Sequence, residues 1–493
     1  MQDDIHDLGL IIDSKVKLLV IESWDELRVV EMLNALAMRR SLQLFTWSVT
    51  NGLESGAVCL DTAAASETGD PEAALRVVKA DPRPNVYVFC DLHPFLEERP
   101  KVVRLLKEIG IAEGDHRPTL ILLSHALKLP LELQRHTARF TLSLPNEDEL
   151  LRIVHEEATR WRASNRGTFV KADGEALKQV ASNLRGLSVG TAQALARTVI
   201  WDDGAISPED IPRLIRAKFQ LMDMQGVLSL ELKTAFLDEV GGLDSLKQWL
   251  VERKPAFMND LTVDAPKGML LVGVQGSGKS LAAKAVAGSW GLPLLRLDFG
   301  CLYNKFFGET ERNLRESLAL AEQMSPCVLW VDELEKGLAA GVNDDGVSHR
   351  ILGTLLTWMA ERKSRVFIVA TSNDIHRLPP ELLRKGRFDE LFFLDLPTSS
   401  VREQIFRIHL ERRGLAPEAF DLPALSTASE GFSGAEIEQA VVSSLYAGQA
   451  RGHAVDQGEL LRTILATAPL SVVMAERLDE LRAWAKDRTV MAD

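Results

Sequence analysis

The chain has 493 residues, which leaves room for about three or four domains, and its 46% hydrophobic and 26% charged residues suit ordinary folded cores. No apolar run approaches the roughly 18 residues that a membrane-spanning helix needs, and the acidic residues 1–4 do not fit a secretory signal, so we expect a cytoplasmic protein without a membrane span. The net charge of −13 argues against broad nucleic-acid binding, which depends on neutralising phosphates, and favours protein partners.

The four cysteines are Cys59, Cys90, Cys301 and Cys327, and none has the CxxC spacing of a metal site. Cys90 and Cys327 lie within apolar, strand-like runs, where a small buried thiol is the expected role. We therefore predict neither a disulfide nor a zinc site.

The first half of the chain contains three apolar runs that predict buried strands, at residues 16–21, 86–91 and 120–124. After the first of these runs the sequence reads Glu22-Ser23-Trp24-Asp25-Glu26-Leu27-Arg28. It has no glycine that would let the backbone wrap around a phosphate, and its acids would repel one. This half is therefore not expected to hold a nucleoside triphosphate.

The second half contains the phosphate-loop pattern Gly273-Val274-Gln275-Gly276-Ser277-Gly278-Lys279-Ser280. Residues 269–272 before it predict a buried strand and residues 281–287 after it predict a helix, which is the context that the motif requires. Glycines let the loop turn its N–H groups toward phosphates, Lys279 can reach the outer phosphates, and the Ser280 hydroxyl can bind Mg²⁺. The other interpretation is a glycine-rich turn with an exposed lysine. We predict an ATP site formed by Gly273, Gly276, Ser277, Gly278, Lys279, Ser280 and Leu281.

Two further strands end in residues suited to ATP hydrolysis. Residues 328–333 form an apolar run ending in Asp332, which can bind Mg²⁺ with Ser280, and Glu333, which can activate the attacking water. Residues 366–373 end in Asn373, whose amide can orient that water. The predicted cofactors are therefore ATP and Mg²⁺, and the predicted catalytic residues include Glu333 and Asn373.

Together with residues 378–389, which follow Asn373, these motifs resemble the AAA family of ATPases in the branch with a second region of homology. The resemblance implies that Arg384 and Arg387 reach into the ATP site of a neighbouring subunit. It also implies a homo-oligomeric ring, usually a hexamer, whose assembly can depend on nucleotide. An arginine that stabilises the transferring phosphoryl group is worth about 10³–10⁵ in rate. The other interpretation is two surface arginines in a salt-bridged loop.

Other positions extend this resemblance. Residues 238–243, including Gly242, resemble the loop beside the adenine, and His409, Gly434 and Ala435 match positions of the helical lid near the base and ribose. The segment with Phe306 and Phe307 resembles a pore loop that grips a protein substrate, although a pair of phenylalanines is more often part of a core. Residues 341–349, rich in Asn, Asp and Gly, predict a second loop.

The first half repeats the second half without its chemistry. The matching segments are 86–91 with 328–332, 120–124 with the strand before Asn373, 129–133 with 378–382, and 186–190 with 431–434. In this comparison Leu92 stands where Glu333 acts and His125 where Asn373 acts, so catalysis is not expected there. A fold kept without its chemistry usually serves assembly or partner binding.

The predicted fold is α/β, with tandem P-loop NTPase modules that each consist of a parallel-sheet core and a helical lid. The boundaries are 1–145 for a degenerate core without a P-loop, 146–225 for its lid and a linker, 226–397 for the active core, and 398–493 for a second lid and a C-terminal helix. The helix at 473–486 repeats apolar residues at helical spacing and is expected to dock on its own lid or on a neighbour's core.

Over nearly its full length the chain resembles the AAA proteins called hypothetical chloroplast reading frames, which occur in plastid genomes, cyanobacteria and other bacteria. The expected location is then a bacterial cytosol or a plastid stroma. The expected activity is Mg²⁺-dependent ATP hydrolysis by a ring that remodels a protein partner. The alternative is a regulatory or scaffold protein in which slow hydrolysis acts as a switch. A motor on nucleic acid is the least favoured class, because it would need a basic channel.

Overall fold

The fold is given by a computed structural model. It describes residues 2–14, 16–55, 68–97, 99–112, 114, 118–222, 227–258, 264–299, 309–338, 345–384, 386–452 and 454–493. The chain divides into two compact units, of which the first comprises Met1–Lys171 and Leu187–Ala205 and the second comprises Ala172–Gly186 and Ile206–Asp493.

The first unit contains a six-stranded sheet in the order β3-β2-β4-β5-β1-β6. Its strands are β1 (Leu18–Glu22), β2 (Leu44–Ser48), β3 (Gly52–Ser55), β4 (Val86–Cys90), β5 (Thr119–Ser124) and β6 (Thr137–Thr141). All neighbouring strands are parallel except β2 and β3. Strands β4 and β5 are buried along their whole length, as expected for unbroken apolar runs at the centre of a parallel sheet covered on both faces.

Two hydrophobic clusters in the first unit hold helices on the two faces of this sheet. Leu75 and Leu106 lie in one cluster with Val20, and Leu8 and Met32 lie in the other with Leu19. The helices of the unit are α1 (Gln2–Asp13), α2 (Glu26–Arg39), α4 (Pro71–Ala80), η1 (His93–Phe95), α5 (Pro100–Gly110), α6 (Leu131–Gln134), α7 (Glu147–Ser164) and α9 (Val189–Asp203). The alternation of adjacent strand residues between the clusters is the period-2 pattern of a strand.

The second unit contains a seven-stranded sheet in the order β15-β14-β10-β13-β12-β11-β9, in which only β9 is antiparallel to its neighbour. The strands are β9 (Leu228–Glu231), β10 (Gly268–Gly273), β11 (Leu294–Leu297), β12 (Cys327–Val331), β13 (Val366–Ser372), β14 (Glu390–Leu394) and β15 (Val490–Met491). The short strands β7 (Lys171–Ala172) and β8 (Ala205–Ile206) lie outside both large sheets.

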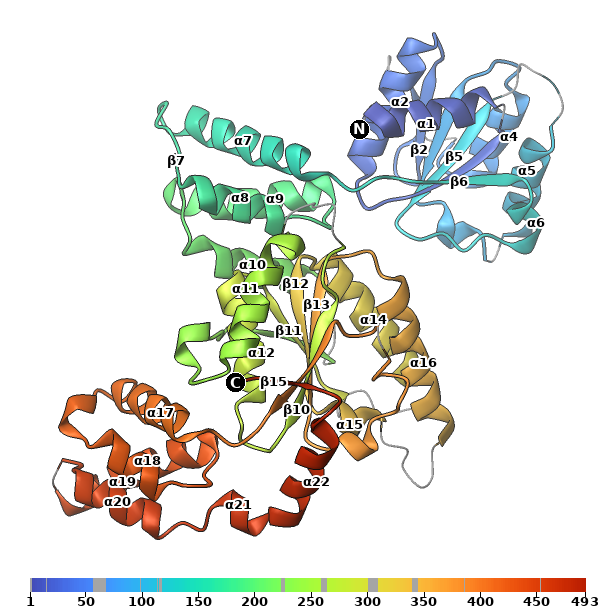
Figure 1. Cartoon of the computed structure of the whole chain (residues 1–493). Helices are drawn as coiled ribbons and strands as arrows, with labels where there is room; N and C mark the ends of the chain where they lie inside the picture. The colour runs from blue at the N-terminus through green and yellow to red at the C-terminus, as the bar shows by residue number, and fades with distance from the viewer. Residues whose placement is uncertain are drawn as a thin grey trace. The chain divides into compact units, whose positions relative to one another are not determined.

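The second unit has helices on both faces of its sheet, a separate helical lid, and further helices that precede β9. They are α8 (Gly174–Asn183), α10 (Asp210–Leu221), η2 (Leu237–Glu239), α11 (Asp244–Met258), α12 (Lys279–Trp290), α14 (Glu309–Gln323), α15 (Leu334–Leu338), α16 (Asp345–Glu361), η3 (Ile375–Arg377), α17 (Ser399–Glu411), η4 (Pro417–Ala419), α18 (Leu422–Ala428), α19 (Gly434–Arg451), α20 (Gln457–Leu465), α21 (Leu470–Val473) and α22 (Ala475–Ala485). In Figure 1, α11 and α12 lie on one side of the strands, while α14 and α16 lie on the other.

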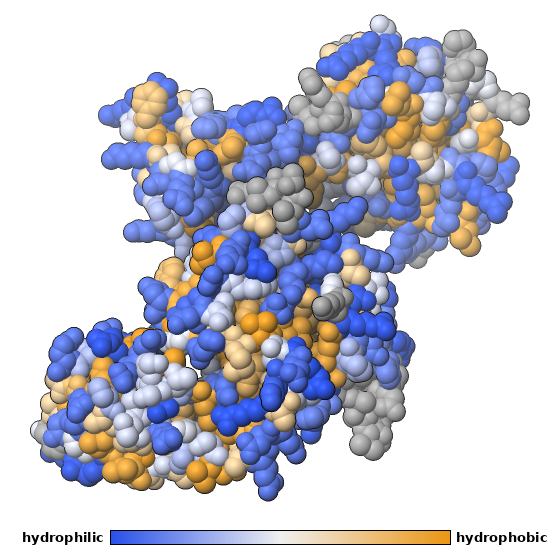
Figure 2. All heavy atoms as spheres, viewed as in Figure 1, coloured by the Kyte–Doolittle hydropathy of each residue, from blue (hydrophilic) through white to orange (hydrophobic). Residues whose placement is uncertain are grey.

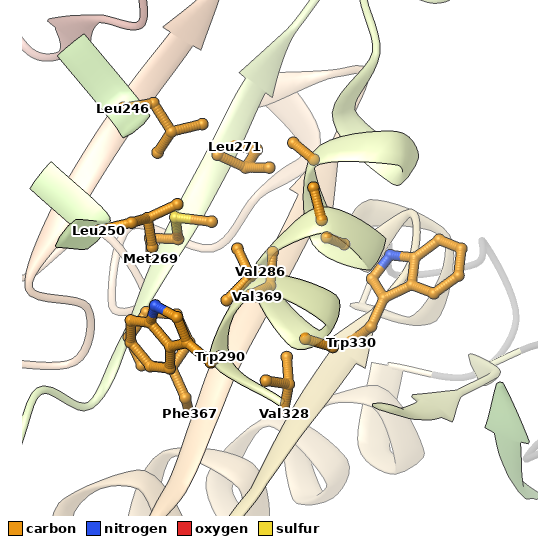
Figure 3. Packing of buried hydrophobic residues seen from close by; sticks show 14 of the residues in the cluster. Leu246, Leu250, Met269, Leu271, Val286, Trp290, Val328, Trp330, Phe367 and Val369 are labelled. Atoms are coloured by element: carbon orange, nitrogen blue, oxygen red, sulfur yellow. The ribbon is translucent and has the colours of Figure 1, made fainter. Parts of the chain in front are cut away.

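The core of the second unit joins α11 and α12 to the central strands. Leu250 on α11 and Val286 on α12 pack with Met269 of β10 and Phe367 of β13 (Figure 3). The Trp290 and Phe367 rings lie 4.7 Å apart between centroids. The lid has its own cluster of buried residues from α17 to α20. This packing fixes the strand ends from which the candidate site projects.

The parallel strands follow the same order in both units, since β6-β1-β5-β4-β2 corresponds to β14-β10-β13-β12-β11. The backbone also changes one alignment made from the sequence. Asp91 after β4 and Glu333 after β12 both have left-handed φ angles, of 53° and 50°, and each is followed by a fully buried leucine. Asp91, and not Leu92, therefore occupies the position of Glu333. Pairing Asp91 with Asp332 by residue type shifts the match by one residue, because the turn after each strand, and not the aspartate, sets the register.

The C-terminal helix α22 contacts the core of its own unit, a docking site that the sequence did not predict. Arg482 on α22 donates hydrogen bonds of 2.8–3.1 Å to both carboxylate oxygens of Asp395, which follows β14. Arg477 contacts Asp374, which follows β13, at 3.1 Å. Strand β15 then adds to the free edge of β14, so backbone pairing holds the segment in place.

The predicted loop at residues 341–349 is partly wrong, because α16 already begins at Asp345, and residues 341–344 lie outside the described residues. In the described part of the chain, no single helix has the length and apolar composition to cross a bilayer; the bent pair Gln457–Val473 and Ala475–Ala485 passes that test only when taken together. Apolar side chains reach the surface along α20 and α21 (Figure 2), where Leu465, Val472 and Val473 are exposed.

Candidate active site

The phosphate loop connects β10 to α12, as its sequence predicts. Gly276 and Gly278 have φ angles of 79° and 94°, a region that other residues rarely adopt. Gly273 lies against β14, where a Cβ atom would stand 2.1 Å from the Leu394 carbonyl oxygen. Gly276 and Gly278 therefore permit the turn of the loop, and Gly273 permits the close packing of β10 against β14.

Lys279 begins α12 and is buried. Its Nζ donates hydrogen bonds to the carbonyl oxygens of Gly273 at 2.9 Å and Val274 at 2.6 Å. Burial lowers the pKa of Lys279 to about 8, while the carboxylates of Glu335, Asp332 and Glu333 oppose that shift. A triphosphate would supply further negative charge and so favour the protonated lysine.

Asp332 is held by groups from two neighbouring strands. Its Oδ1 accepts a hydrogen bond of 2.8 Å from the Thr371 hydroxyl, and its Oδ2 lies 3.1 Å from Nη2 of Arg296. The same Thr371 hydroxyl accepts a hydrogen bond of 3.0 Å from the Glu333 backbone N–H. Thr371 therefore fixes the orientation of the adjacent Asp332 and Glu333.

Glu333 and Asn373 meet at the carboxyl ends of β12 and β13. The Asn373 side-chain amide donates to Glu333 Oε1 at 3.1 Å, while the Asn373 backbone N–H donates to Glu335 Oε1 at 2.9 Å. Glu333 also pairs with Lys336, and this hydrogen bond raises the pKa of Lys336. The predicted base and the predicted water-orienting amide are thus in direct contact.

Thr371→Val is expected to lower the ATPase rate by about tenfold or more, because it removes the hydroxyl that bridges Asp332 and the Glu333 backbone, a loss comparable to that of other residues which orient metal ligands. The Mg²⁺ concentration for half-maximal rate should rise as well. Titrating Mg²⁺ against phosphate release measures both effects. Thr198→Val on the exposed face of α9 is the matched control, and an unchanged Mg²⁺ requirement in Thr371→Val would contradict the positioning role.

These residues line one cavity of about 540 Å³ in the second unit, a size suited to a nucleotide. The predicted site residues in its wall are Gly276, Ser277, Gly278, Lys279, Ser280, Leu281, Asp332, Glu333, Asn373, His409, Gly434 and Ala435. The Ser280 hydroxyl and the Asp332 carboxylate in this wall are hard oxygen donors of the kind that Mg²⁺ prefers.

The lid closes the cavity from one side and contacts the phosphate loop directly. The Ala435 backbone N–H donates to the Gly276 carbonyl oxygen at 3.2 Å, and Ser433 caps α19 in front of it. On α17, burial lowers the pKa of His409, against the opposing charge of Glu438. A neutral imidazole at this position is suited to packing beside a base rather than to binding a phosphate.

Several predicted residues lie outside the cavity wall. Gly273 supports the loop from behind, and Gly242 contributes its backbone N–H to Gln404 Oε1 at 3.0 Å, so that its neighbours Gly241 and Leu243 line the cavity instead. Phe306 and Phe307 lie outside the described residues.

The two predicted finger arginines also lie outside this cavity. Arg384 is exposed, whereas Arg387 is half-buried and donates to the Leu356 carbonyl oxygen on α16. Neither side chain therefore lines the ATP site of its own chain.

Sequence reasoning missed several residues of the wall, including Asp395, Glu438 and Asp493. Asp493 accepts a hydrogen bond from the Leu243 backbone N–H, and Leu243 has a left-handed φ of 60°. No motif marks Asp493, because β15 brings it to the site from the far end of the unit. Thr371 and Glu335 carried a weak signal, since each stands two residues from a predicted catalytic residue.

Three parts of the chain match known protein families. Residues 269–396 match the ATPase family associated with various cellular activities (AAA). Residues 4–142 match the N-terminal domain, and residues 148–225 the second domain, of SpoVK-like AAA ATPases. The fold and the site together define an AAA ATPase, an enzyme that hydrolyses ATP.

Individual relatives show to which family of AAA ATPases the chain belongs. The AAA domain-containing protein ycf46 of Pyropia yezoensis is 34% identical to the chain, over 98% of this chain and 97% of the relative. The ycf46 protein of Gracilaria tenuistipitata var. liui is 31% identical over 97% of each chain. The chain therefore belongs to the ycf46 family of AAA proteins, which confirms the resemblance predicted from the sequence. It is also 35% identical to the proteasome-activating nucleotidase of Aeropyrum pernix, over 46% of this chain and 58% of the relative.

Proposed function

We propose that the protein is a ring-forming, Mg²⁺-dependent ATPase that remodels a protein partner. The observation that carries the ATPase chemistry is the convergence of Lys279, Asp332, Glu333 and Asn373 on one cavity whose floor is the phosphate loop. ATP fills this cavity with its phosphates against residues 276–280. Ser280 and Asp332 would hold Mg²⁺, which would neutralise charge on the phosphates.

Hydrolysis then needs a water positioned in line with the terminal phosphate. Asn373 orients this water, and Glu333 accepts its proton at a carboxylate oxygen as the water oxygen bonds to phosphorus. The bond from phosphorus to the bridging oxygen of ADP breaks, and Lys279 balances charge on the phosphate oxygens. The contact between Asn373 and Glu333, at 3.1 Å, supports this pairing of roles.

The ring proposal rests on the arginines. Arg384 and Arg387 are absent from the cavity wall of their own chain, which supports their acting on the site of a neighbour. A hexamer, with its assembly promoted by nucleotide, is the proposed working unit. Hydrolysis in that arrangement depends on assembly, because each site lacks its stabilising arginine until a neighbour is in place.

The lid is the proposed link between nucleotide and movement. Its only described backbone bond to the phosphate loop runs from Ala435 to Gly276, and a Cβ atom on Gly276 would stand 2.9 Å from Ser433 Oγ. A change in the loop on loss of the terminal phosphate would therefore be passed to α19. Such a movement is the means by which the ring would pull or release a partner.

We further propose that the first unit is a degenerate copy of the second. The shared order of its parallel strands supports this origin, and the segment after β1 lacks the glycines of a phosphate loop. A copy without ATP chemistry would serve assembly or partner binding in a bacterial cytosol or plastid stroma.

The two candidate functions differ in what the ring does to its partner. In the first, Phe306 and Phe307 grip a client in the ring channel; its relative from Aeropyrum pernix is named a proteasome-activating nucleotidase. In the second, ATP orders the ring as a switch and hydrolysis acts as a slow timer. Both functions would use the same ATP site and the same contact between the lid and the phosphate loop. The effect of a client on the ATPase rate therefore distinguishes them.

Measuring the ATPase rate and the light-scattering mass against protein concentration tests the proposal. For a remodelling ring we expect the rate per chain to rise cooperatively as the mass rises, and casein, an unfolded model client, to stimulate it. Phe306→Ala should lose this stimulation, whereas Phe169→Ala, an exposed phenylalanine of the first unit, should keep it. A flat, near-zero rate from a monomer with ATP would instead favour the switch.

A further inference from the structure

A cluster of metal-ligand side chains lies at the carboxyl edge of the sheet in the first unit. Asp91 follows β4, His93 lies in η1, and His125 follows β5. One ligand atom from each of these residues lies within 4.8 Å of the other two. Because β4 and β5 are paired neighbours, the sheet itself brings together residues that are far apart in the sequence.

Two of these side chains are held by the buried hydroxyl of Ser124, the last residue of β5. Ser124 Oγ lies 2.8 Å from His93 Nδ1 and 3.3 Å from Asp91 Oδ1. His93 Nδ1 also lies 3.7 Å from Asp91 Oδ1, and with Nδ1 engaged by Ser124 an ion would have to bind His93 through Nε2. Such a hydrogen bond to the second imidazole nitrogen is the usual way in which proteins orient a metal-binding histidine.

The His125 ring is oriented by two aromatic neighbours. Trp24 stacks on it with 4.6 Å between ring centroids and 29° between planes. The His93 ring meets it edge-on, at 5.0 Å and 89°. The two imidazole rings are therefore nearly perpendicular, and His125 and Asp91 are exposed to solvent.

The location matches the hydrolytic edge of the second unit. Asp91 shares the left-handed backbone of Glu333, and His125 follows Ser124 as Asn373 follows Ser372. The carboxyl edge of the sheet holds the candidate groups for ATP hydrolysis in the second unit. The same edge holds two imidazoles and a carboxylate in the first unit. The loop after β1 lacks glycine, so this edge faces no phosphate cradle of its own.

We propose that Asp91, His93 and His125 bind a divalent transition-metal ion, with Zn²⁺ as the probe that best suits the set. Imidazole nitrogens favour Zn²⁺ and its neighbours over Mg²⁺ and Ca²⁺, which prefer oxygen alone. Zinc bonds of about 2.0–2.2 Å require donor atoms roughly 3.4 Å apart. Small rotations of the exposed Asp91 and His125 side chains would close the cluster to that separation, and solvent would fill the open position.

The sequence-based prediction of no zinc site rested on cysteine spacing. It therefore does not cover a site formed by two histidines and an aspartate. Its ligands are Asp91 and His93, which lie two residues apart, and His125, which a helix and a strand separate from them; the pairing of β4 with β5 brings the three together. The site is also independent of the ATP chemistry, since all of its residues belong to the first unit.

The test is a titration of the full chain, stripped of metal with a chelator and without nucleotide, first with Co²⁺ for its visible absorption and then with Zn²⁺ by calorimetry. We expect one ion per chain in the first unit and Co²⁺ bands of a four- or five-coordinate site. His93→Ala and His125→Ala should each weaken binding by about tenfold or more. His155→Ala, which removes an exposed histidine of α7 in the same unit, should bind as the wild type does.

Equal Zn²⁺ affinity in wild type, His93→Ala and His125→Ala would overturn the proposal, as would the absence of Zn²⁺ binding to the wild type at about 100 μM, because a site of micromolar affinity would be nearly saturated at that level. Far-UV circular dichroism separates loss of the ligand from loss of the fold. Asp91→Asn, which changes an exposed side chain and keeps its size, should weaken binding less than either histidine variant, because an amide oxygen can still coordinate.

Discussion

Arg387→Ala is expected to lower the ATPase rate by about 10³–10⁵-fold while ATP still binds, the range found for arginines that stabilise the charge on a transferring phosphoryl group. Binding should persist because Arg387 does not line the cavity of its own chain. Phosphate release measures the rate, and calorimetry with ATP measures binding. Arg407→Ala, on the exposed face of lid helix α17, is the matched control.

Mixing separates a finger that acts on a neighbour from a structural arginine. Arg387→Ala has an intact ATP site and Lys279→Ala has an intact finger, so mixed rings should contain some sites with both and regain activity. A mixture without activity, in samples where mass analysis demonstrates mixed rings, would contradict action in trans. Because Arg387 also donates to the Leu356 carbonyl oxygen, an equal melting temperature in wild type and variant is needed before the loss of rate is assigned to the finger.

The ATP site was the most predictable part of the molecule, and the reason is physical. A phosphate loop needs left-handed glycines at fixed positions, and Gly276 and Gly278 have that backbone. The Asp332 and Glu333 carboxylates must follow a buried strand, and β12 is buried throughout. A site that requires a particular residue type at a fixed position in the chain can therefore be predicted from the sequence.

Other residues of the candidate site reach it only through tertiary packing, which leaves little trace in the local sequence. Asp493 reaches the cavity only because β15 pairs with β14, and α22 docks through Arg482 and Asp395, an ion pair between residues of ordinary surface type. In the sequence Thr371 is one more residue of a buried strand, and only the fold places its hydroxyl between Asp332 and Glu333. The register of Asp91 similarly depended on a turn rather than on residue identity.

Glu333→Gln is expected to bind ATP and to lose about 10²–10⁴-fold in hydrolysis, the contribution of a general base. Glutamine keeps the size of the side chain and a carbonyl oxygen for the 3.1 Å bond from Asn373, but it cannot accept a proton from water at neutral pH. Phosphate release and ATP calorimetry measure the two properties separately. Glu361→Gln, at the exposed end of α16, controls for the loss of one negative charge.

Retained hydrolysis in Glu333→Gln would overturn the assignment of the base and direct attention to Glu335. That carboxylate accepts the Asn373 backbone N–H through Oε1, and its buried Oε2 has no hydrogen-bond partner among the described residues. Glu335→Gln alone should change the rate little, because glutamine keeps a carbonyl oxygen that can accept the Asn373 backbone N–H and Glu333 still takes the proton. If Glu333 is the base, adding Glu335→Gln to Glu333→Gln should cost little more, because the chemical step is already lost.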